Sequence, residues 1–581
     1  MSWKTPTRAY CSISILFAPL PWPIKRHFNL NPFTLSMSTM LSPQKDWNGN
    51  DNFFNFTRAR FVTDEAKQMA IRRVQFNMNE LAQIAAKSIG ASHCVGIEKC
   101  PDGLYNKAYI FTMDNGHQVI GKVPNPNAGV PHHTTASEVA TMDFMRTVLG
   151  VPVPAVHASN SRVESSPVGA EFIIMEKVPG IPLRKVWGSF KSTDKLKVFL
   201  QVFRYQQAWA TASFDQFGSL YYAEDLERLP SDHLFIDSKG SPGSNSKFTV
   251  GPAVGREWFD EDRGAIDCDR GPWKSLLEYR KAIAAREIAA VKTLRRIPDQ
   301  IMMLCGPKLY EPTATKKLEA LRYYLRILEF LLPTDPQLTS GHLWHNDLHD
   351  ENIFVDPEDA TQICGIIDWQ STQISPLFDH SVDPSFLTYE GPEVGDNLDI
   401  PELPDNYDSL PADEKRAAMK IHHDHCVMVA WRRLVRKKSP AQYNALQFRK
   451  TTAAKILTIS RRIFEMGETH LMALLLELRE EWKDLPAVRE SQNPPPSPLH
   501  FSEEHIDQIE RDLGASLKGM DITSEIEARL GNLWPENGAV GHEQYEDTKA
   551  ALIEQKKELM SHTVRSEEDR VLFERFWPFK D

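Results

Sequence analysis

The residues best suited to chemistry lie in Leu343–Val355, which reads LWHNDLHDENIFV. His345, Asp347 and Asn352 form an H-x-D-x-x-x-x-N pattern there, and Asp368 follows sixteen residues after Asn352 within an Ile-Ile-Asp-Trp sequence. Phosphoryl transfer needs a carboxylate that orients an acceptor hydroxyl and takes its proton, together with ligands for a divalent cation. These residue types, in this order, therefore predict phosphoryl-transfer chemistry.

Each residue of the pattern has a predicted role. Asp347 is the candidate catalytic base, while Asn352 and Asp368 are candidate Mg²⁺ ligands because Mg²⁺ prefers oxygen donors. A short hairpin between Asn352 and Asp368 would allow both to face one cavity. His345 belongs to the catalytic loop, where we expect it to pack and hydrogen-bond rather than transfer a proton. The alternative is that each polar residue only caps its own loop backbone.

A lysine upstream could serve the same chemistry. Lys122 lies within the short apolar strand Val119–Val123, where burial of an unpaired ammonium is costly. Glu138, near the start of the next predicted helix, is its natural partner, and the pair would hold the α- and β-phosphates of a nucleotide. Glu138 also fits a capping box with Thr135. Lys107 is the second candidate for the phosphate-binding lysine.

The elements that must position these residues change in kind along the chain. Residues 62–90 have a helical pattern, and a β-rich segment with one helix follows, in which Asn115-Gly116 marks a hairpin turn. Leucines at spacings of three and four around 318–332 predict a core helix ending at Pro333. The strands are predicted at Cys94–Lys99, Lys107–Met113, Gln118–Val123, Glu171–Met175, Asn352–Val355 and Ile363–Ile367.

Composition limits the class of protein. The 581 residues exceed what one core usually supports, and 41% hydrophobic with 25% charged residues is typical of a globular chain. A formal charge of −11 disfavours nucleic-acid binding, and no apolar stretch is long enough for a transmembrane segment. The 7 cysteines show no CxxC spacing, which favours a reducing compartment without a disulfide framework or a structural zinc site.

The first 45 residues differ from the rest of the chain. They contain five basic residues and no acid, so the remaining chain carries a formal charge of −16. A basic, hydroxyl-rich and acid-free start predicts a mitochondrial transit peptide, disordered and outside the fold. A disordered terminus without a targeting role is the alternative.

The sequence resembles the aminoglycoside phosphotransferase and choline-kinase-like family of the protein-kinase-like fold, and most closely its fungal altered-inheritance-of-mitochondria type. The resemblance covers roughly residues 50–581, and the catalytic loop with the Ile-Asp-Trp sequence is its most specific part. The segments that carry it are Asp102–Lys107, Lys122–Gly129, Thr134–Met142, Val151–Pro154, Met175–Gly180, His345–Asn352 and Ile367–Trp369.

The resemblance implies an α+β bilobal protein-kinase-like fold: a small antiparallel N-lobe sheet with one helix, a large mainly helical C-lobe, and a helical C-terminal extension. ATP and Mg²⁺ would bind between the lobes, with backbone groups around Glu176 and Val178 meeting the adenine. The predicted segments are a transit peptide (1–45), a helical N-terminal extension (46–92), the N-lobe (93–180), the C-lobe (181–482), a Pro-rich linker (483–500) and the helical extension (501–581).

The predicted activity is transfer of the γ-phosphate of Mg·ATP to a hydroxyl of a small molecule, in the mitochondrion; protein partners are not predicted. We expect Trp369 and Asp379 to wall part of the acceptor pocket. The sequence lacks G-x-G-x-x-G, so the phosphate-covering turn would be Pro101–Asn106. A pseudokinase or scaffold that binds nucleotide without turnover is therefore the alternative.

The histidines allow two further interpretations, both of them metal sites. A non-haem iron site formed by His345, Asp347 and a distal histidine would leave Asn352, Asp368 and the upstream lysine unexplained. The His422–His425 cluster is expected to be an exposed polar turn rather than a metal site, because on a helix only some of its members share a face.

Overall fold

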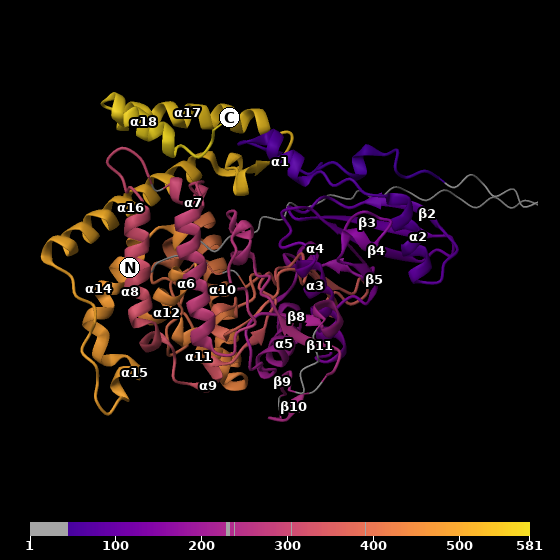
Figure 1. The fold of residues 1–581 in the computed structure, drawn as a ribbon, viewed down its shortest axis with the longest axis horizontal. Helices are drawn as coiled ribbons and strands as arrows, with labels where there is room; N and C mark the ends of the chain where they lie inside the picture. The colour runs from indigo at the N-terminus through magenta and orange to yellow at the C-terminus, as the bar shows by residue number, and fades with distance from the viewer. Residues whose placement is uncertain are drawn as a thin grey trace, which may run out of the picture.

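A computed structural model describes residues 45–227, 233–237, 239–243, 245–303, 305–387, 389 and 391–580. The predicted transit peptide therefore lies almost entirely outside the described residues. A β-rich lobe lies at one end of the molecule, a helical lobe forms its body, and the last helices cross one side of it (Figure 1). The predicted α+β bilobal architecture with a helical extension is confirmed.

The N-lobe is built on a 5-stranded antiparallel sheet with strand order β2-β3-β4-β6-β5. Buried and half-buried residues alternate along β3, as expected for a strand with one face in the core. Gly116 has a φ of 82° in the turn before β4, as the Asn-Gly pair predicts. The elements are β2 (Cys94–Lys99), β3 (Asn106–Met113), β4 (Gln118–Pro124), α3 (His133–Thr147), β5 (Val156–Asn160) and β6 (Phe172–Glu176).

Helix α3 corrects one local prediction. The helix begins at His133 and its N-cap residue is His132, so Thr135 lies inside the first turn and does not cap it. Glu138 lies beyond the N3 position, which Thr135 occupies, and its side chain is buried. The far end of α3 contributes Phe144 to the large C-lobe core, so this helix lies between the two lobes.

The segment before the N-lobe is less helical than predicted, because the single helix expected over residues 62–90 is interrupted at Arg73–Asn77. The side chain of Asn77 accepts a hydrogen bond from Glu80 N and starts a new helix. Upstream, Phe53 and Phe54 are buried in the core of the N-lobe sheet. The elements are β1 (Arg60–Phe61), α1 (Glu65–Arg72) and α2 (Met78–Ser88).

The C-lobe is mainly helical and surrounds one large hydrophobic core. The helix predicted around 318–332 is α8, and its C-cap residue Leu332 precedes Pro333. Of the leucines that predict it, Leu321 and Leu328 are buried, whereas Leu325 is 37% exposed. Its helices are α4 (Arg184–Trp187), α5 (Ser192–Thr211), α6 (Leu276–Thr293), α7 (Asp299–Met302), α8 (Ala314–Leu331), α9 (Pro336–Thr339), α10 (Ala412–Lys438), α11 (Pro440–Phe448), α12 (Thr452–Ser460), α13 (Ile463–Met466), α14 (Thr469–Glu481) and α15 (Pro486–Arg489).

Short strands in this lobe hold the loops of the site. Strand β13 pairs antiparallel with both β14 and β7, which places the segment after the N-lobe beside the predicted catalytic hairpin. The strands are β7 (Ile181–Pro182), β8 (Ser219–Tyr222), β9 (Phe235–Ile236), β10 (Pro242–Gly243), β11 (Phe248–Gly251), β12 (His342–Leu343), β13 (Ile353–Val355), β14 (Ile363–Ile366) and β15 (Ile374–Ser375).

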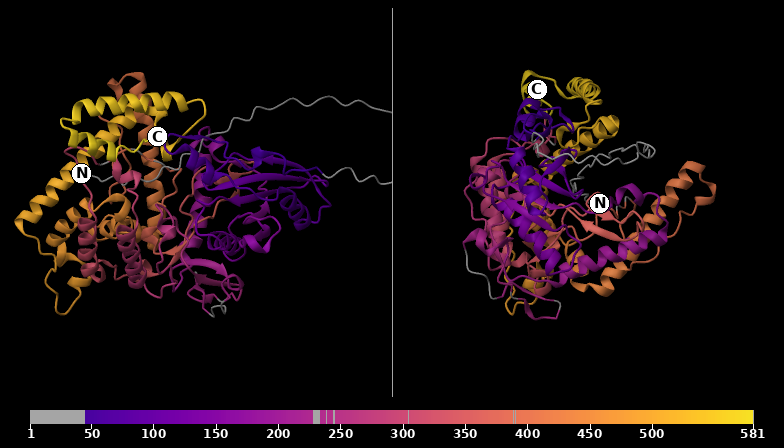
Figure 2. Two further views of the ribbon diagram at one scale, coloured as in Figure 1. Left: turned by 45° about the horizontal axis from the view of Figure 1, so that its top comes forward. Right: turned by 90° about the vertical axis from the view of Figure 1, so that its right-hand side faces the viewer.

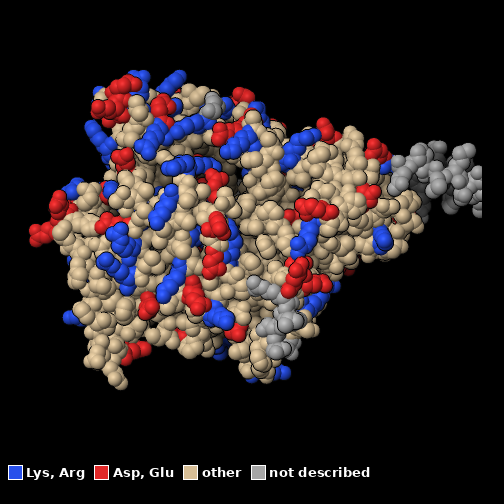
Figure 3. Space-filling view, viewed as in Figure 1, with Lys and Arg blue, Asp and Glu red and all other residues tan. Residues whose placement is uncertain are grey.

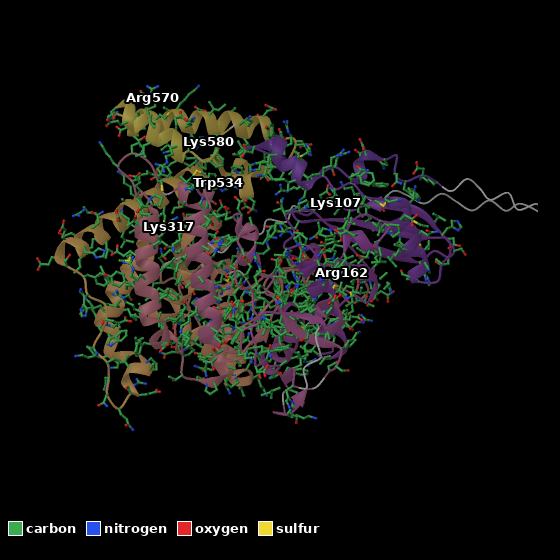
Figure 4. All side chains as sticks on the ribbon, in the orientation of Figure 1. Lys107, Arg162, Lys317, Trp534, Arg570 and Lys580 are labelled. Carbon is green, nitrogen blue, oxygen red and sulfur yellow. The ribbon has the colours of Figure 1, made fainter. Side chains whose placement is uncertain are left out.

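The last part of the chain forms α16 (Glu503–Leu530), β16 (Ala539–Val540), α17 (Tyr545–Thr563) and α18 (Glu567–Phe576). These helices cross the top of the C-lobe and end beside α1, as two further views confirm (Figure 2). Near the chain end, the Phe579 ring lies edge-on to Trp534, which Figure 4 labels, at 5.7 Å between ring centroids.

Charged side chains of both signs are interspersed over the face shown in Figure 3. Among the helices that the structure describes, none is long and apolar enough to cross a membrane.

Two buried histidines behind the catalytic loop predict a loss of stability in mild acid. Burial lowers the pKa of His342 and of His380 to about 4. Above pH 6.5 both are neutral in the folded and unfolded chain, but on acidification the unfolded chain binds protons first. The free energy of unfolding should therefore fall by roughly 1–2 kcal/mol per histidine between pH 7 and 5.

Thermal unfolding followed by circular dichroism at pH 7 and pH 5 measures this. His380→Gln should show a shallower pH dependence than the wild type, and the exposed His117→Gln should not. Equal slopes for all three proteins would show that these imidazoles do not govern acid stability.

Candidate active site

The predicted catalytic loop lies between β12 and β13 and is held by a hydrogen bond within the loop. The side-chain amide nitrogen of Asn352 donates to the backbone carbonyl of Asp347 at 3.0 Å. Asn352 is buried, whereas the Asp347 carboxylate is 38% exposed. Because the amide nitrogen is held by the loop, the amide oxygen is the end directed away from this bond. A buried amide oxygen and an accessible carboxylate therefore lie on the same loop.

Asp368 is connected to this loop through its neighbour in the chain. Ile367 N donates to the Asn352 carbonyl at 3.0 Å, which places Asp368 at the end of β14 beside the catalytic loop. The φ of Asp368 is 63°, a left-handed conformation that costs energy for a residue with a side chain. Its carboxylate is 41% exposed, so it can reach a ligand.

Lys122 joins the two lobes at this point. Its Nζ lies 2.6 Å from Glu138 Oε1 on α3 and 3.0 Å from Asp368 Oδ1 in the C-lobe. Burial opposes the charge of Lys122, but the carboxylates of Asp368 and Glu138 outweigh it and raise the pKa of the lysine. Burial likewise opposes the charge of Asp368, yet Lys122 lowers the pKa of this carboxyl below its ordinary value. The predicted Lys122–Glu138 contact is thus present and extends to Asp368.

Lys107, the second lysine considered, faces elsewhere. Its Nζ donates to Asp102 Oδ1 at 3.0 Å and to the carbonyl of Asn55 at 2.7 Å. It is buried on the N-lobe, where Figure 4 labels it, and it contacts the turn between β2 and β3 and the segment before the sheet. Of the two lysines, Lys122 is the one in contact with Asp368.

His345 is placed as a support for the loop. Its Nε2 lies 2.8 Å from the carbonyl of Ile367, and its ring packs edge-on against Trp369 at 4.7 Å between centroids. Burial lowers the pKa of His345, so the ring is neutral at pH 7 and donates to the carbonyl. This histidine therefore connects the catalytic loop to the residue before Asp368.

A second histidine on the loop was not singled out from the sequence. His349 Nε2 lies 3.6 Å from Asp347 Oδ2. Burial opposes protonation of His349, but the Asp347, Glu351 and Asp350 carboxylates outweigh it and raise its pKa. The crowding of acids around a histidine in HNDLHDE was the available signal. His349 is positioned to influence the charge of the candidate base.

The predicted adenine-binding segment lies at the end of β6. Glu176 N donates to the Ala155 carbonyl at 2.8 Å, and the Glu176 carboxylate accepts from Ala155 N at 3.1 Å. The Val178 side chain packs over Gly365, where a Cβ would lie 2.6 Å from Val178 Cγ1. The N–H of Glu176 is therefore already used within the sheet, and the Val178 side chain is packed against β14.

Two residues expected at the acceptor pocket are in the core instead. Trp369 is 0% exposed and its indole N–H donates to the Ile366 carbonyl at 3.0 Å. The Asp379 side chain is 1% exposed and pairs with Arg280 at 2.5 Å and Arg461 at 3.0 Å. A carboxylate this deep between two guanidinium groups is a structural ion pair, so neither residue can contact an acceptor.

Among the described residues, no group of three or more His, Cys, Asp or Glu side chains is arranged to hold a metal ion. His422–His425 lies within α10, and His422 Nε2 lies 3.0 Å from the carbonyl of Pro401. The expected polar turn is thus a helical segment. The two-oxygen set of Asn352 and Asp368 suits Mg²⁺, which is usually held by few protein ligands together with substrate phosphates.

Comparison with known proteins agrees with this geometry. Residues 278–379 match the family described as Phosphotransferase enzyme family, a span that includes Asp347, Asn352 and Asp368. A subtelomeric hrmA-associated cluster protein of Aspergillus fumigatus is 31% identical over 359 residues, covering 57% of this chain and 67% of that protein. The chain belongs to the phosphotransferase enzyme family. The predicted resemblance is therefore confirmed.

More distant members of the family span more of the chain. Altered inheritance of mitochondria protein 9 of Yarrowia lipolytica is 22% identical over 503 residues, which cover 82% of this chain and 83% of that protein. The protein of the same name from Saccharomyces cerevisiae is 25% identical over 445 residues, which cover 71% and 68%. Both are named as mitochondrial proteins, and the predicted mitochondrial location is confirmed by these relatives.

Among solved structures, this family member aligns with a thermostable mutant of aminoglycoside phosphotransferase APH(4)-Ia in ternary complex with ADP and hygromycin B. The two are 13% identical, with 68% of this chain and 97% of that chain covered and a TM-score of 0.33.

Proposed function

We propose that the protein transfers the γ-phosphate of Mg·ATP to a hydroxyl group of a small molecule. The observation that supports this best is the contact of Lys122 with both Glu138 and Asp368 across the lobes. Hydrogen bonds connect the segment before Asp368 to Asn352, and Asn352 to Asp347. One lysine, one amide and two carboxylates are thereby linked through hydrogen bonds of their side chains and of the adjoining backbone.

The residues fit Mg·ATP, which when bound would supply the phosphoryl group and the charge-neutralising cation. Asn352 and Asp368 would hold Mg²⁺ through oxygen, and Lys122, aimed by Glu138, would hold the α- and β-phosphates. Asp347 would accept a hydrogen bond from the acceptor hydroxyl, orient it and take its proton. His345 would keep the loop in register with Asp368.

A screen of a mitochondrial metabolite extract with γ-labelled ATP tests this proposal. The wild type should label at least one small molecule, and Asp368→Ala should abolish the labelling. Asp521→Ala, an exposed carboxylate on α16, is the matched control and should label as the wild type does.

Two outcomes would contradict the proposal. Equal labelling by the wild type and Asp368→Ala would show that the transfer does not use this site. If the wild type bound Mg·ATP but neither labelled any compound nor released phosphate, the result would instead support the pseudokinase alternative.

A further inference from the structure

The turn expected to cover the phosphates, residues 101–106, is held rigidly although it is poor in glycine. Asp102 is 1% exposed and its carboxylate accepts from Thr57 N at 2.8 Å and from Thr57 Oγ1 at 3.0 Å. The same carboxylate accepts from Lys99 Nζ at 2.7 Å and from Lys107 Nζ at 3.0 Å. Four donors on one buried carboxylate fix the start of the turn.

The rest of the turn is held by contacts with the C-lobe. Asn106 and Gln370 exchange side-chain amide hydrogen bonds at 2.8 and 3.3 Å, so the turn meets the residue two positions after Asp368. The Arg256 guanidinium lies 3.9 Å from the centre of the Tyr105 ring and comes from the C-lobe. The turn therefore contacts the C-lobe in two places.

The segment that donates to Asp102 belongs to an N-terminal arm, residues 54–63. Phe56, Ala59 and Phe61 of the arm form a small buried cluster. Leu104 from the turn packs against one part of this cluster, and Ala539 from the C-terminal extension packs against it as well. The arm thus lies between the turn and the extension and contacts both.

The arm and the extension are joined as strands. β1 pairs antiparallel with β16, with Arg60 opposite Val540 and Phe61 opposite Ala539. Val62 N donates to the Gly538 carbonyl at 3.0 Å. Phe61 and Ala539, which are opposite each other in this pairing, both contribute to the buried cluster. The register of the two strands therefore sets the position of the arm relative to the turn.

Side chains reinforce this pairing. The Arg60 guanidinium lies 3.4 Å from the centre of the Tyr545 ring and donates to Glu65 at 2.7 and 3.0 Å. Tyr545 in turn donates its hydroxyl proton to Glu65 at 3.1 Å. Arg60, Glu65 and Tyr545 form a closed triangle between the arm and the extension.

The other end of the extension is docked on the C-lobe. Lys316 Nζ on α8 lies 2.7 Å from Asp512 on α16, and Thr523 donates to the Met303 carbonyl at 3.0 Å. Phe576 of α18 is buried in a cluster with Ile301. The extension therefore runs from the back of the C-lobe to the arm (Figures 1 and 2).

We propose that the C-terminal extension is an intramolecular strap that holds the turn 101–106 closed over the nucleotide. A phosphate-covering loop rich in glycine can move independently, whereas this turn can lift only if the arm moves with it. The strap supplies from outside the lobe the positioning that the turn's own sequence does not supply. Thr57, Arg60 and Tyr545 are positioning residues in this device, which rests on the nucleotide site proposed above.

Hydrogen exchange and nucleotide kinetics in the full-length protein test the strap. Arg60→Ala removes the triangle, and Ala539→Glu places a charge against the buried cluster. Arg529→Ala is the matched control, since it breaks an ion pair with Glu558 at 2.9 Å inside the extension. Arg60→Ala and Ala539→Glu should each speed two processes by roughly three- to tenfold: amide hydrogen exchange in residues 101–106 and release of a fluorescent Mg·ATP analogue. This is the size of effect expected from the loss of one cation–π contact. The control should leave both unchanged.

The readouts separate two failures. If the wild type binds no analogue, the proposed function is wrong, but exchange in residues 101–106 still decides the strap. If Arg60→Ala exchanges and releases as Arg529→Ala does, the strap is wrong while the site stands. Hydrogen exchange in α3 and α8 shows whether a variant keeps its fold. If Ala539→Glu does not fold, Arg60→Ala alone tests the strap.

Discussion

Asp347→Asn is expected to lower the rate of γ-phosphate transfer by roughly 10²–10⁴-fold, the usual contribution of a general base, with little change in Mg·ATP affinity. Asparagine has the same shape but cannot take the acceptor's proton. The loop should stay in place because Asn352 is held by the backbone carbonyl of Asp347, which the substitution keeps. Single-turnover transfer and equilibrium binding of the nucleotide measure the two quantities separately.

Asp350→Asn is the matched control for this prediction. Asp350 lies three residues further along the same loop and pairs loosely with Arg184 at 3.7 Å. Its substitution should change the transfer rate only a few-fold. If Asp347→Asn retained most of the wild-type rate, the carboxylate would not be the base, and the role of the neighbouring His349 would need to be tested.

Lys122→Met is expected to reduce transfer on the order of 10²-fold or more, the scale for removing one preorganised donor to a developing charge. It should also destabilise the fold by about 3–5 kcal/mol, because Glu138 is left buried without a cation. That deficit should shrink as the pH falls, since burial already raises the pKa of Glu138 and protonation removes its charge. Denaturant unfolding at pH 7 and pH 5 measures it.

The double variant Lys122→Met with Glu138→Gln separates the two effects. Removing both charges should restore most of the stability at pH 7, because a neutral amide is far less costly to bury than an isolated carboxylate. It should not restore transfer, which needs the ammonium. A double variant that regained transfer along with stability would mean that Lys122 acts only through the fold.

Lys122 connects the two lobes of the molecule. Its contacts with Glu138 on α3 and Asp368 in the C-lobe hold the helix and the lobes in register. Two hydrogen bonds between the side-chain amides of Asn106 and Gln370 connect the lobes at a second point. The described structure therefore has its candidate site assembled, and the strap would help to keep it so.

The sequence by itself determined the candidate catalytic loop, the pairing of Lys122 with Glu138, and the strands β2, β3, β4, β6, β13 and β14 around them. These follow from local patterns: a spaced polar motif, an Asn-Gly turn, and a lysine within an apolar strand. Local pattern did not determine the start of α3, where Thr135 and Glu138 matched a capping box. A buried ion pair with Lys122 decided the place of Glu138 instead.

Only the tertiary structure decided which polar residues lie together at the candidate site. Asp379 follows Asp368 closely in sequence, yet its carboxylate is enclosed by Arg280 of α6 and by Arg461, which directly follows α12. The pairing of β1 with β16 could not be predicted from the sequence either, because each strand has only two residues and most of the chain lies between them. Contacts between segments this distant leave no periodic signal in either segment, and they form only when the whole chain has folded.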